Sequence, residues 1–173
     1  NIAYEAAALL KQDFPQVGGL ELRIHKCIPV AAGMAGGSTN AAAVLFGMNK
    51  LYRLGLSRSR LMEYGLRLGA DVPYCLMRGT ALAEGIGERL TRLPPMPDCH
   101  ILIAKPPVSV STKLVYQALD ACRHLEHPPI DAQLADLERQ DLLALSHHMG
   151  NVLEHVTVPM HPEITQIRQM MLD

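Results

Sequence analysis

The first apolar positions of the chain recur with the period of an α-helix. They predict an amphipathic helix over residues 1–13, with one apolar face formed by Ile2, Ala6, Leu9 and Leu10. Residues 20–28 then alternate between apolar and polar side chains, which predicts a half-buried β-strand. An alanine-rich apolar stretch, residues 40–54, predicts a second helix. A third helix begins after Ser57, a residue type that favours the N-cap position, and ends at Gly69.

Shorter patterns follow in the second half of the chain. Residues 74–90 predict strands with turns at three glycines, Gly79, Gly85 and Gly87. The run His-Ile-Leu-Ile-Ala, residues 100–104, predicts a buried strand, and residues 113–119 predict a short helix. Helical patterns fill most of the remaining chain and break near Gly150 and Pro159. Because helices and strands mix without a regular alternation, the predicted fold class is α+β.

The composition excludes several classes of protein. The 173 residues include 49% hydrophobic and 19% charged residues, which is close to globular averages and sufficient for a sizeable core. Sixteen Lys and Arg against seventeen Asp and Glu give a formal net charge of -1. This balance excludes the basic footprint of a nucleic-acid-binding protein. No apolar run approaches the roughly 20 residues of a transmembrane helix, so we expect no membrane partner either.

The cysteines and the ends of the sequence add two expectations. The cysteines are far apart and form no CxxC pair; they are Cys27, Cys75, Cys99 and Cys122. We expect buried free thiols in a reducing cytoplasm rather than disulfides or a zinc site. Neither end carries a helix cap or stop signal, and we expect these residues to be the internal part of a longer protein.

One segment carries recognisable chemistry. Three glycines, Gly33, Gly36 and Gly37, are followed by two hydroxyl residues, Ser38 and Thr39, at the start of the second predicted helix. Glycine lets the backbone approach a bulky anion, and the N–H groups and dipole of a helix N-terminus favour phosphate. The hydroxyls donate to phosphate oxygens or hold Mg²⁺. This phosphate cradle predicts that Gly36→Val weakens ATP binding with a modest effect on folding. The alternative is a plain turn before an alanine-rich core helix.

The spacing of these glycines excludes the two common nucleotide motifs, because no Lys follows Gly37 as in a P-loop and no GxGxxG is present. The stretch PVAAGMAGGSTNAAAV, residues 29–44, resembles instead the phosphate loop of the GHMP kinases. Other segments resemble the same family, namely GADVPY (69–74), GTALAEGIGE (79–88), KPPVSVST (105–112) and GNVLE (150–154). The resemblance covers essentially the whole chain. Within the family it points to the kinases of non-mevalonate isoprenoid synthesis.

The resemblance implies a fold and a reaction. The GHMP kinase fold is related to the second domain of ribosomal protein S5, and a left-handed βαβ unit places its glycine loop. We therefore expect residues 1–90 to be part of the N-terminal ATP-binding domain and residues 91–173 part of the C-terminal domain. The implied reaction transfers the γ-phosphate of ATP, with Mg²⁺, to the 2-hydroxyl of 4-diphosphocytidyl-2-C-methyl-D-erythritol.

The resemblance also implies roles for single residues. Asp71 matches the base that accepts the proton of the substrate hydroxyl; on the residues alone, an aspartate that caps the turn before Pro73 is the favoured alternative. Ser38 matches a hydroxyl near Mg²⁺. The residues implied in ATP binding are Asn1, Lys26, Pro29, Val30, Ala31, Ala32, Gly33, Met34, Ala35, Gly36, Gly37, Ser38 and Thr39.

Two more residues match positions that bind the acceptor substrate. Thr112 matches a contact to its methylerythritol end, and Tyr116, one helical turn later, matches an aromatic side chain that packs against the cytosine. The alternative for Tyr116 is a core tyrosine. The alternative for Lys26 is a solvated strand charge, and Asn1 is alternatively a frayed terminal residue.

Two other functions stay open at this point. The first is another GHMP kinase, for homoserine or mevalonate, which the segment of residues 108–112 opposes. The second is nucleotide binding without turnover. It is motivated by two family motifs that this sequence lacks, an N-terminal segment with Lys, Asn and His and a C-terminal GSGPT-like motif.

Overall fold

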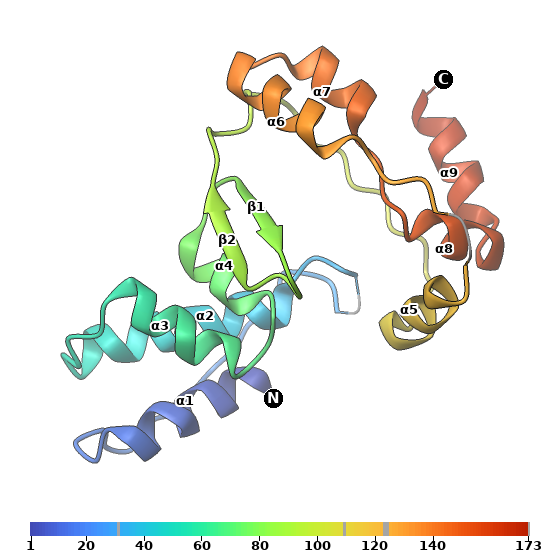
Figure 1. The fold of residues 1–173 in the computed structure, drawn as a ribbon. Coiled ribbons are helices and arrows are strands. Elements are labelled where there is room, and N and C mark those ends of the chain that lie inside the picture. The colour runs from blue at the N-terminus through green and yellow to red at the C-terminus, as the bar shows by residue number, and fades with distance from the viewer. Residues whose placement is uncertain (31, 109, 123–124, 173) are drawn as a thin grey trace. The chain divides into compact units, whose positions relative to one another are not determined.

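The computed structural model of this chain describes residues 1–30, 32–108, 110–122 and 125–172. The chain divides into two compact units, residues 1–93 and residues 94–173. Figure 1 shows the helices and strands from which each unit is built.

The first unit is formed by the helices α1 (Ile2–Asp13), α2 (Gly36–Leu51), α3 (Arg58–Leu66) and α4 (Val72–Met77). α1 packs along α2, and α4 packs against α2 and α3. Their apolar faces meet in one core, whose largest fully buried apolar side chains are Leu10, Leu45 and Val72. The helix predicted over residues 1–13 is confirmed. α2 begins four residues earlier than predicted, because the glycines and hydroxyl residues of the loop form its first turn.

A short hairpin completes the first unit. β1 (Ala81–Glu84) and β2 (Arg89–Arg92) are antiparallel, and the last residue of β1 pairs with the first residue of β2. In the turn Gly85 has a φ of +70° and Gly87 a φ of +107°, a left-handed conformation that favours glycine. The turns predicted at these two glycines are confirmed. The strand predicted from residue 74 is wrong at its start, because residues 74–77 belong to α4.

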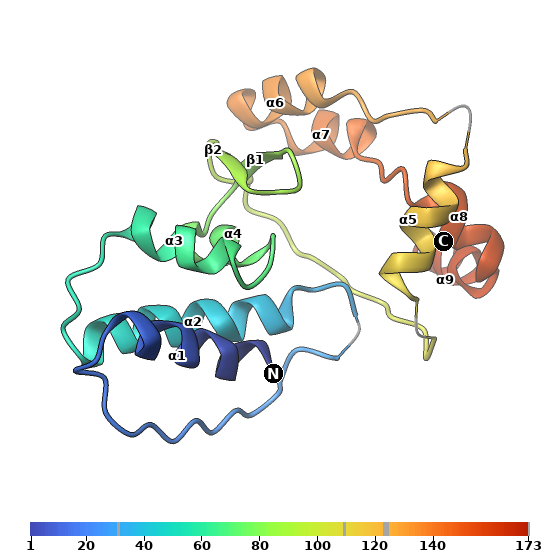
Figure 2. The ribbon, with the colours of Figure 1, turned by 60° about the horizontal axis from the view of Figure 1, so that its bottom comes forward.

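The strand predicted over residues 20–28 is wrong. This segment is an irregular, extended stretch, which Figure 2 shows in the chain between α1 and α2. Its alternation is visible at the cavity beside α1, which Leu20, Leu22 and Ile24 line without Arg23 or His25. A second cavity is lined by Arg23 and His25 as well. A strand is held by hydrogen bonds to a neighbouring strand, and among the described residues β1 and β2 form the only ladder. The left-handed βαβ unit therefore has no parallel ladder within the described part of the chain.

The buried strand predicted over residues 100–104 is also wrong. The segment has no regular structure, and Ile101, Leu102 and Ile103 are 76%, 75% and 63% exposed. An apolar strand is buried when neighbouring strands and helices cover its edges and faces. Here the apolar side chains stay in contact with water.

The second unit is helical, with α5 (Thr112–Asp120), α6 (Ile130–Arg139), α7 (Leu142–His148), α8 (Glu154–Met160) and α9 (Glu163–Leu172). α6 packs against α7, and α8 contacts both α5 and α9. The fully buried carboxylate of Asp136 joins α6 to α7, since it lies 2.6 Å from a guanidinium nitrogen of Arg139 and 2.6 Å from Nδ1 of His148. The short helix predicted over residues 113–119 and the helical remainder are confirmed.

The cysteines are free thiols, as predicted, but the burial predicted for them is wrong. Cys27, Cys99 and Cys122 are exposed, and Cys75 is half-buried. The reason is local for two of them, because Cys27 lies in the extended segment of residues 20–28 and Cys99 directly precedes the irregular segment of residues 100–104.

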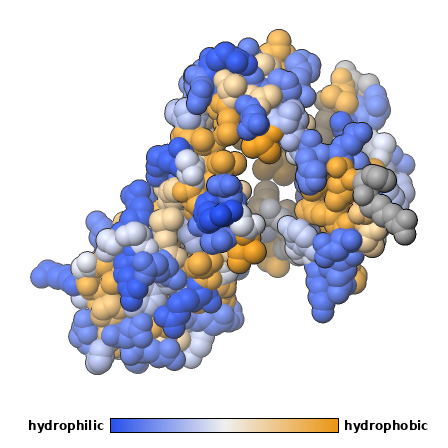
Figure 3. All heavy atoms as spheres, in the orientation of Figure 1, coloured by the Kyte–Doolittle hydropathy of each residue, from blue (hydrophilic) through white to orange (hydrophobic). Residues whose placement is uncertain are grey.

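The surface of the first unit is mostly polar on the face that Figure 3 presents, where hydrophilic side chains surround smaller apolar patches. None of the helices in the described part of the chain combines the length and apolar character needed to cross a bilayer.

Candidate active site

The glycine loop leads directly into α2. Ala35 is the N-cap residue of this helix and has a left-handed φ of +49°. The first backbone hydrogen bond of the helix runs from the N–H of Thr39 to the carbonyl oxygen of Ala35, at 2.8 Å. The N–H groups of Gly36, Gly37 and Ser38 therefore precede the hydrogen-bond ladder of the helix. They point out of the N-terminus of a 16-residue helix, where an anion is favoured.

The two sides of the loop differ in their surroundings. Gly33 has a φ of +67°, and a Cβ atom built there meets no atom within 4 Å. On the other side the loop is packed, since a Cβ on Gly36 would lie 3.0 Å from Cγ2 of Ile28. Gly33 therefore allows the left-handed turn of the loop, whereas Gly36 makes room for an apolar side chain beneath it.

Because Gly36 is packed against Ile28, the Gly36→Val variant tests the stability of the protein as well as ATP binding. We expect the variant to lose about 1–3 kcal/mol of unfolding free energy, because the branched side chain overlaps Ile28. We therefore expect a measurable loss of unfolding free energy, where the sequence led us to expect only a modest effect on folding. Urea unfolding of the variant and the parent measures the difference. Gly33→Ala is the comparison, since its Cβ meets open space and its cost of about 1–2 kcal/mol comes only from the left-handed backbone. A Gly36→Val protein as stable as the parent would contradict the packing described here.

Asp71 occupies the N-cap position of α4, and its side chain is exposed. Its carboxylate accepts no capping hydrogen bond from the helix, which argues against the capping role favoured on the residues alone. Its carbonyl oxygen accepts the N–H of Cys75 at 3.1 Å and so belongs to the first turn of α4. An exposed carboxylate that does not cap its own helix is available to accept a proton from a bound alcohol.

Two close approaches bring the start of α2 near α4 and the turn that precedes it. The hydroxyl oxygen of Thr39 lies 3.6 Å from the sulfur of Cys75. On the core side, the side chain of Ile2 reaches 3.6 Å from the position that a Cβ of Gly37 would take, and also 3.6 Å from that of Gly69. The fold thus places the N-terminus of α2 beside the turn that carries Asp71.

The turn between β1 and β2 lies against the residue that precedes Asp71. A Cβ on Gly87 would lie 3.9 Å from Cβ and from the carbonyl oxygen of Ala70, the residue before Asp71. Within the turn, the N–H of Ile86 donates to a carboxylate oxygen of Glu88 at 2.7 Å. Hydrogen bonds from the N–H groups of Glu88 and Ile86 lower the pKa of Glu88. Its carboxylate therefore remains ionised and braces the turn beside Asp71.

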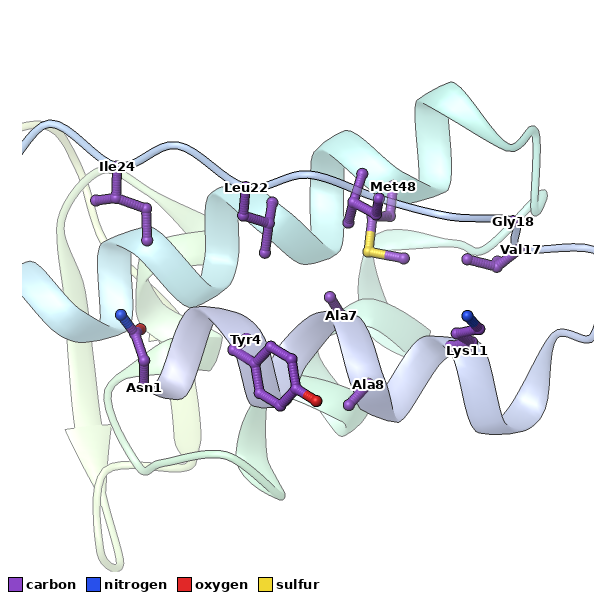
Figure 4. Close-up of a pocket in the computed structure, with 11 residues that line it drawn as sticks. Asn1, Tyr4, Ala7, Ala8, Lys11, Val17, Gly18, Leu22, Ile24 and Met48 are labelled. Atoms are coloured by element: carbon purple, nitrogen blue, oxygen red, sulfur yellow. The ribbon is translucent and has the colours of Figure 1, made fainter.

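Asn1 and Lys26 come from two segments next to the place where the glycine loop meets the turn of Asp71. Asn1 caps α1, since its side-chain oxygen accepts the N–H of Ala3 at 3.1 Å, so the expectation that the first helix has no cap is wrong. It also lines a cavity of about 380 Å³, and Figure 4 shows Leu22 and Ile24 pointing into it from the extended segment. Lys26 is exposed on the same segment. Neither this cavity nor the second one, of about 440 Å³, is lined by the loop glycines or Asp71.

The other residues predicted to bind ATP precede α2. Val30 is 75% exposed, and Pro29 is exposed as well. Ala32 and Met34 are half-buried in the loop. Ala31 lies outside the described residues.

The predicted acceptor residues belong to the second unit. Thr112 is the first residue of α5, and Tyr116 follows one turn later on the same face. Both side chains are exposed, whereas Val115 is buried. The alternative of a core tyrosine is wrong, because Tyr116 is 52% exposed.

Comparison with known proteins extends this picture. Residues 1–79 match the family model of the GHMP kinases N terminal domain. A 4-diphosphocytidyl-2-C-methyl-D-erythritol kinase of Lachnospira eligens is 56% identical over 173 residues, which are 100% of this chain and 60% of that relative. Residues 1–79 thus belong to the GHMP kinase N-terminal domain family, and the whole chain is similar to 4-diphosphocytidyl-2-C-methyl-D-erythritol kinases.

Further relatives give the same picture. A 4-diphosphocytidyl-2-C-methyl-D-erythritol kinase of Geobacillus kaustophilus is 49% identical over 171 residues, covering 99% of this chain and 59% of the relative. A crystal structure of a 4-(cytidine 5'-diphospho)-2C-methyl-D-erythritol kinase matches with a TM-score of 0.75 and 32% identity, over 98% of this chain and 60% of the other. The predicted GHMP kinase fold is therefore confirmed. The chain spans about 60% of the length of the relatives that it matches.

The start of α2 offers an oxygen ligand for a magnesium ion brought by a nucleotide. Among the described residues no group of three or more His, Cys, Asp or Glu side chains is placed to hold a metal. Mg²⁺ needs no such cage, because it commonly takes one or two protein oxygens and completes its shell with phosphate and water. Ser38, half-buried in the first turn of α2, offers one such oxygen at the helix N-terminus.

The sequence did not indicate that two residues, Cys75 and Ile2, lie where the start of α2 approaches the turn of Asp71 and α4. Cys75 was identified only as a free thiol, although its place four residues after Asp71 puts both on one face of a helix turn. Ile2 was identified only as a core position of the first helix. No local signal places it near Gly37 and Gly69, because these residues are far from Ile2 in the chain.

Proposed function

We propose that the protein containing this chain transfers the γ-phosphoryl group of ATP to the 2-hydroxyl of 4-diphosphocytidyl-2-C-methyl-D-erythritol, a step of non-mevalonate isoprenoid synthesis. The names of the relatives support this acceptor. The observation that carries the reaction class is the contact of 3.6 Å between Thr39 and Cys75, which sets the glycine loop beside the turn of Asp71. A phosphate site next to an exposed carboxylate suits phosphoryl transfer to an alcohol.

The nucleotide side of the proposed site is the loop of residues 29–39. The N–H groups in the first turn of α2 donate to phosphate oxygens, and the hydroxyls of Ser38 and Thr39 add two further donors. Asn1 and Lys26 extend this side toward the base and ribose. Mg²⁺, when bound at the phosphates with Ser38 as a ligand, neutralises charge on the transferred group.

The acceptor side centres on Asp71. The 2-hydroxyl oxygen forms a bond to the γ-phosphorus while its proton passes to the Asp71 carboxylate. The bond from the γ-phosphorus to the bridging oxygen breaks, and ADP leaves with that electron pair. Since the transition state is loose, position matters more than strong basicity. In the second unit, Thr112 binds the methylerythritol end and Tyr116 stacks on the cytosine.

The rest of the assignment follows from the family. We assign residues 1–90 to the N-terminal ATP-binding domain and residues 91–173 to the C-terminal domain. The free thiols fit a reducing cytoplasm. The formal net charge of -1 fits small-molecule partners better than nucleic acid.

A substrate panel tests the proposed function. We expect a coupled ADP-release assay of the protein containing this chain to give roughly 1–100 turnovers per second with 4-diphosphocytidyl-2-C-methyl-D-erythritol. Homoserine and mevalonate lack a pyrimidine for Tyr116, so their kcat/KM should be lower by at least about 10-fold. Preference for either one would move the function to another GHMP kinase. ATP binding in calorimetry without turnover of any acceptor would leave a nucleotide-binding protein instead.

A further inference from the structure

We propose that Cys75 is a positioning residue whose thiol donates a hydrogen bond to the Thr39 hydroxyl, so that the hydroxyl proton is directed to a phosphate oxygen of the nucleotide. This inference rests on the proposed function, because that function places the phosphates at the start of α2. It adds to the nucleotide side of the site a residue that lies in α4, outside the glycine loop.

The side chains of Cys75 and Thr39 are in direct contact. Sulfur and hydroxyl oxygen lie 3.6 Å apart, a separation at which the large sulfur atom still shares a hydrogen with oxygen, although the residues are 36 positions apart in the chain. Thr39 is exposed, whereas Cys75 is half-buried and packs against the core. The thiol therefore reaches the hydroxyl from the core side and leaves the other side of Thr39 open to a ligand.

The chemistry of the two groups decides the direction of this hydrogen bond when a nucleotide is bound. A threonine hydroxyl has one proton to donate and two lone pairs with which to accept. An anionic phosphate oxygen takes this proton in preference to the thiol, because sulfur is a weak acceptor. A hydroxyl that donates to an anion is also polarised into a stronger acceptor. With phosphate present, the thiol therefore donates to Thr39.

The thiol can orient the hydroxyl because α4 is held at both ends. In its first turn, the N–H of Cys75 donates to the carbonyl oxygen of Asp71 at 3.1 Å. In its last turn, the guanidinium of Arg92 in β2 donates to the carbonyl oxygen of Met77 at 2.9 Å. The side chain of Met77 is itself buried. The sulfur is therefore presented to α2 from a fixed element.

Cys75→Ala tests the proposal, because it removes the thiol and keeps a small residue that favours a helix. In the protein containing this chain, we expect calorimetry to show that the Kd for ATP rises about three- to ten-fold, as for one lost neutral hydrogen bond. In kinetics, KM for ATP should rise while kcat stays within about two-fold, since the phosphates are held in ground and transition state alike. Cys99→Ala is the matched control, because it removes the same sulfur from an exposed cysteine outside the site, and it should leave both constants unchanged.

A double-mutant cycle separates orientation of the hydroxyl from general packing. Thr39→Val keeps the branched shape of the side chain and removes the hydroxyl, so the Kd for ATP should rise about 10- to 100-fold. In Thr39→Val/Cys75→Ala, the second change should add less than about two-fold, because the thiol acts only through the hydroxyl. Cys75→Ser keeps a hydrogen donor and should bind ATP within about two-fold of the parent.

Three results would overturn the proposal. An unchanged or lower Kd for ATP in Cys75→Ala would show that the thiol does not help Thr39 to donate. An equal loss from Cys75→Ala with and without the Thr39 hydroxyl would assign the effect to packing, and so would a Cys75→Ser protein as weak as Cys75→Ala. ADP release, measured on the same proteins, reports separately on the proposed function. If the parent binds ATP but turns over no acceptor, that function has failed, and the binding cycle still decides on Cys75. A parent that binds no ATP overturns both.

Discussion

Asp71→Asn is expected to lower kcat by about 10²–10⁴-fold, the usual range for a lost general base. The amide keeps the size of the side chain and its place at the start of α4, but it removes the oxygen that accepts the proton. Affinity for ATP should be nearly unchanged, because the phosphates are held at the N-terminus of α2. Steady-state kinetics with the diphosphocytidyl substrate and calorimetry with ATP measure the two quantities.

A matched control separates this effect from a general change of charge. Asp131→Asn removes one exposed carboxylate from the first turn of α6 and should leave kcat unchanged. Urea unfolding of Asp71→Asn should give nearly the parent stability, since its carboxylate caps no N–H of α4. If Asp71→Asn loses stability while kcat is preserved, the residue is a structural cap and its role as base has to be abandoned.

Tyr116→Ala is expected to raise KM for the diphosphocytidyl substrate by roughly 10–100-fold, because stacking of a base on an aromatic ring contributes about 1–3 kcal/mol. KM for ATP should not change. Folding should also be preserved, since Tyr116 is 52% exposed and alanine favours a helix. Initial rates at varied acceptor concentration give the two constants.

Tyr116→Phe is the control for this experiment. It keeps the aromatic face and removes only the hydroxyl, so its KM for the acceptor should remain close to that of the parent. An unchanged KM in Tyr116→Ala would show that the exposed ring is an ordinary surface residue of α5. An equal rise in both variants would assign the effect to the hydroxyl rather than to stacking.

The helices could largely be predicted from the sequence because their signals are local. Ser57 accepts the N–H of Arg60 at 3.2 Å, as its N-cap position requires. The face of Leu9 and Leu10 packs into the core, as the helical period predicts. The glycine turn of the hairpin was equally local, since its left-handed positions favour glycine.

The hairpin strands lie within the region predicted to form strands, but the strands predicted over residues 20–28 and 100–104 are wrong. Residues 20–28 have the alternation of a strand, and Leu20, Leu22 and Ile24 line one cavity beside α1 together. Alternation specifies which side chains share a face, but a strand also needs a second backbone to accept and donate hydrogen bonds. The same difference separates the apolar run of residues 100–104 from the buried strand that it predicts.

For the candidate site, the sequence indicates the residue types, whereas only the folded structure brings them together. The glycines, the hydroxyls and Asp71 are recognisable as residue types at characteristic spacings, and so the family and the chemistry could be inferred before any coordinate was known. Their proximity could not, because the approach of Ile2 to Gly37 and Gly69, and the contact of Thr39 with Cys75, involve residues far apart in the chain. Such contacts depend on how the helices pack around a shared core, and no local pattern encodes that distance.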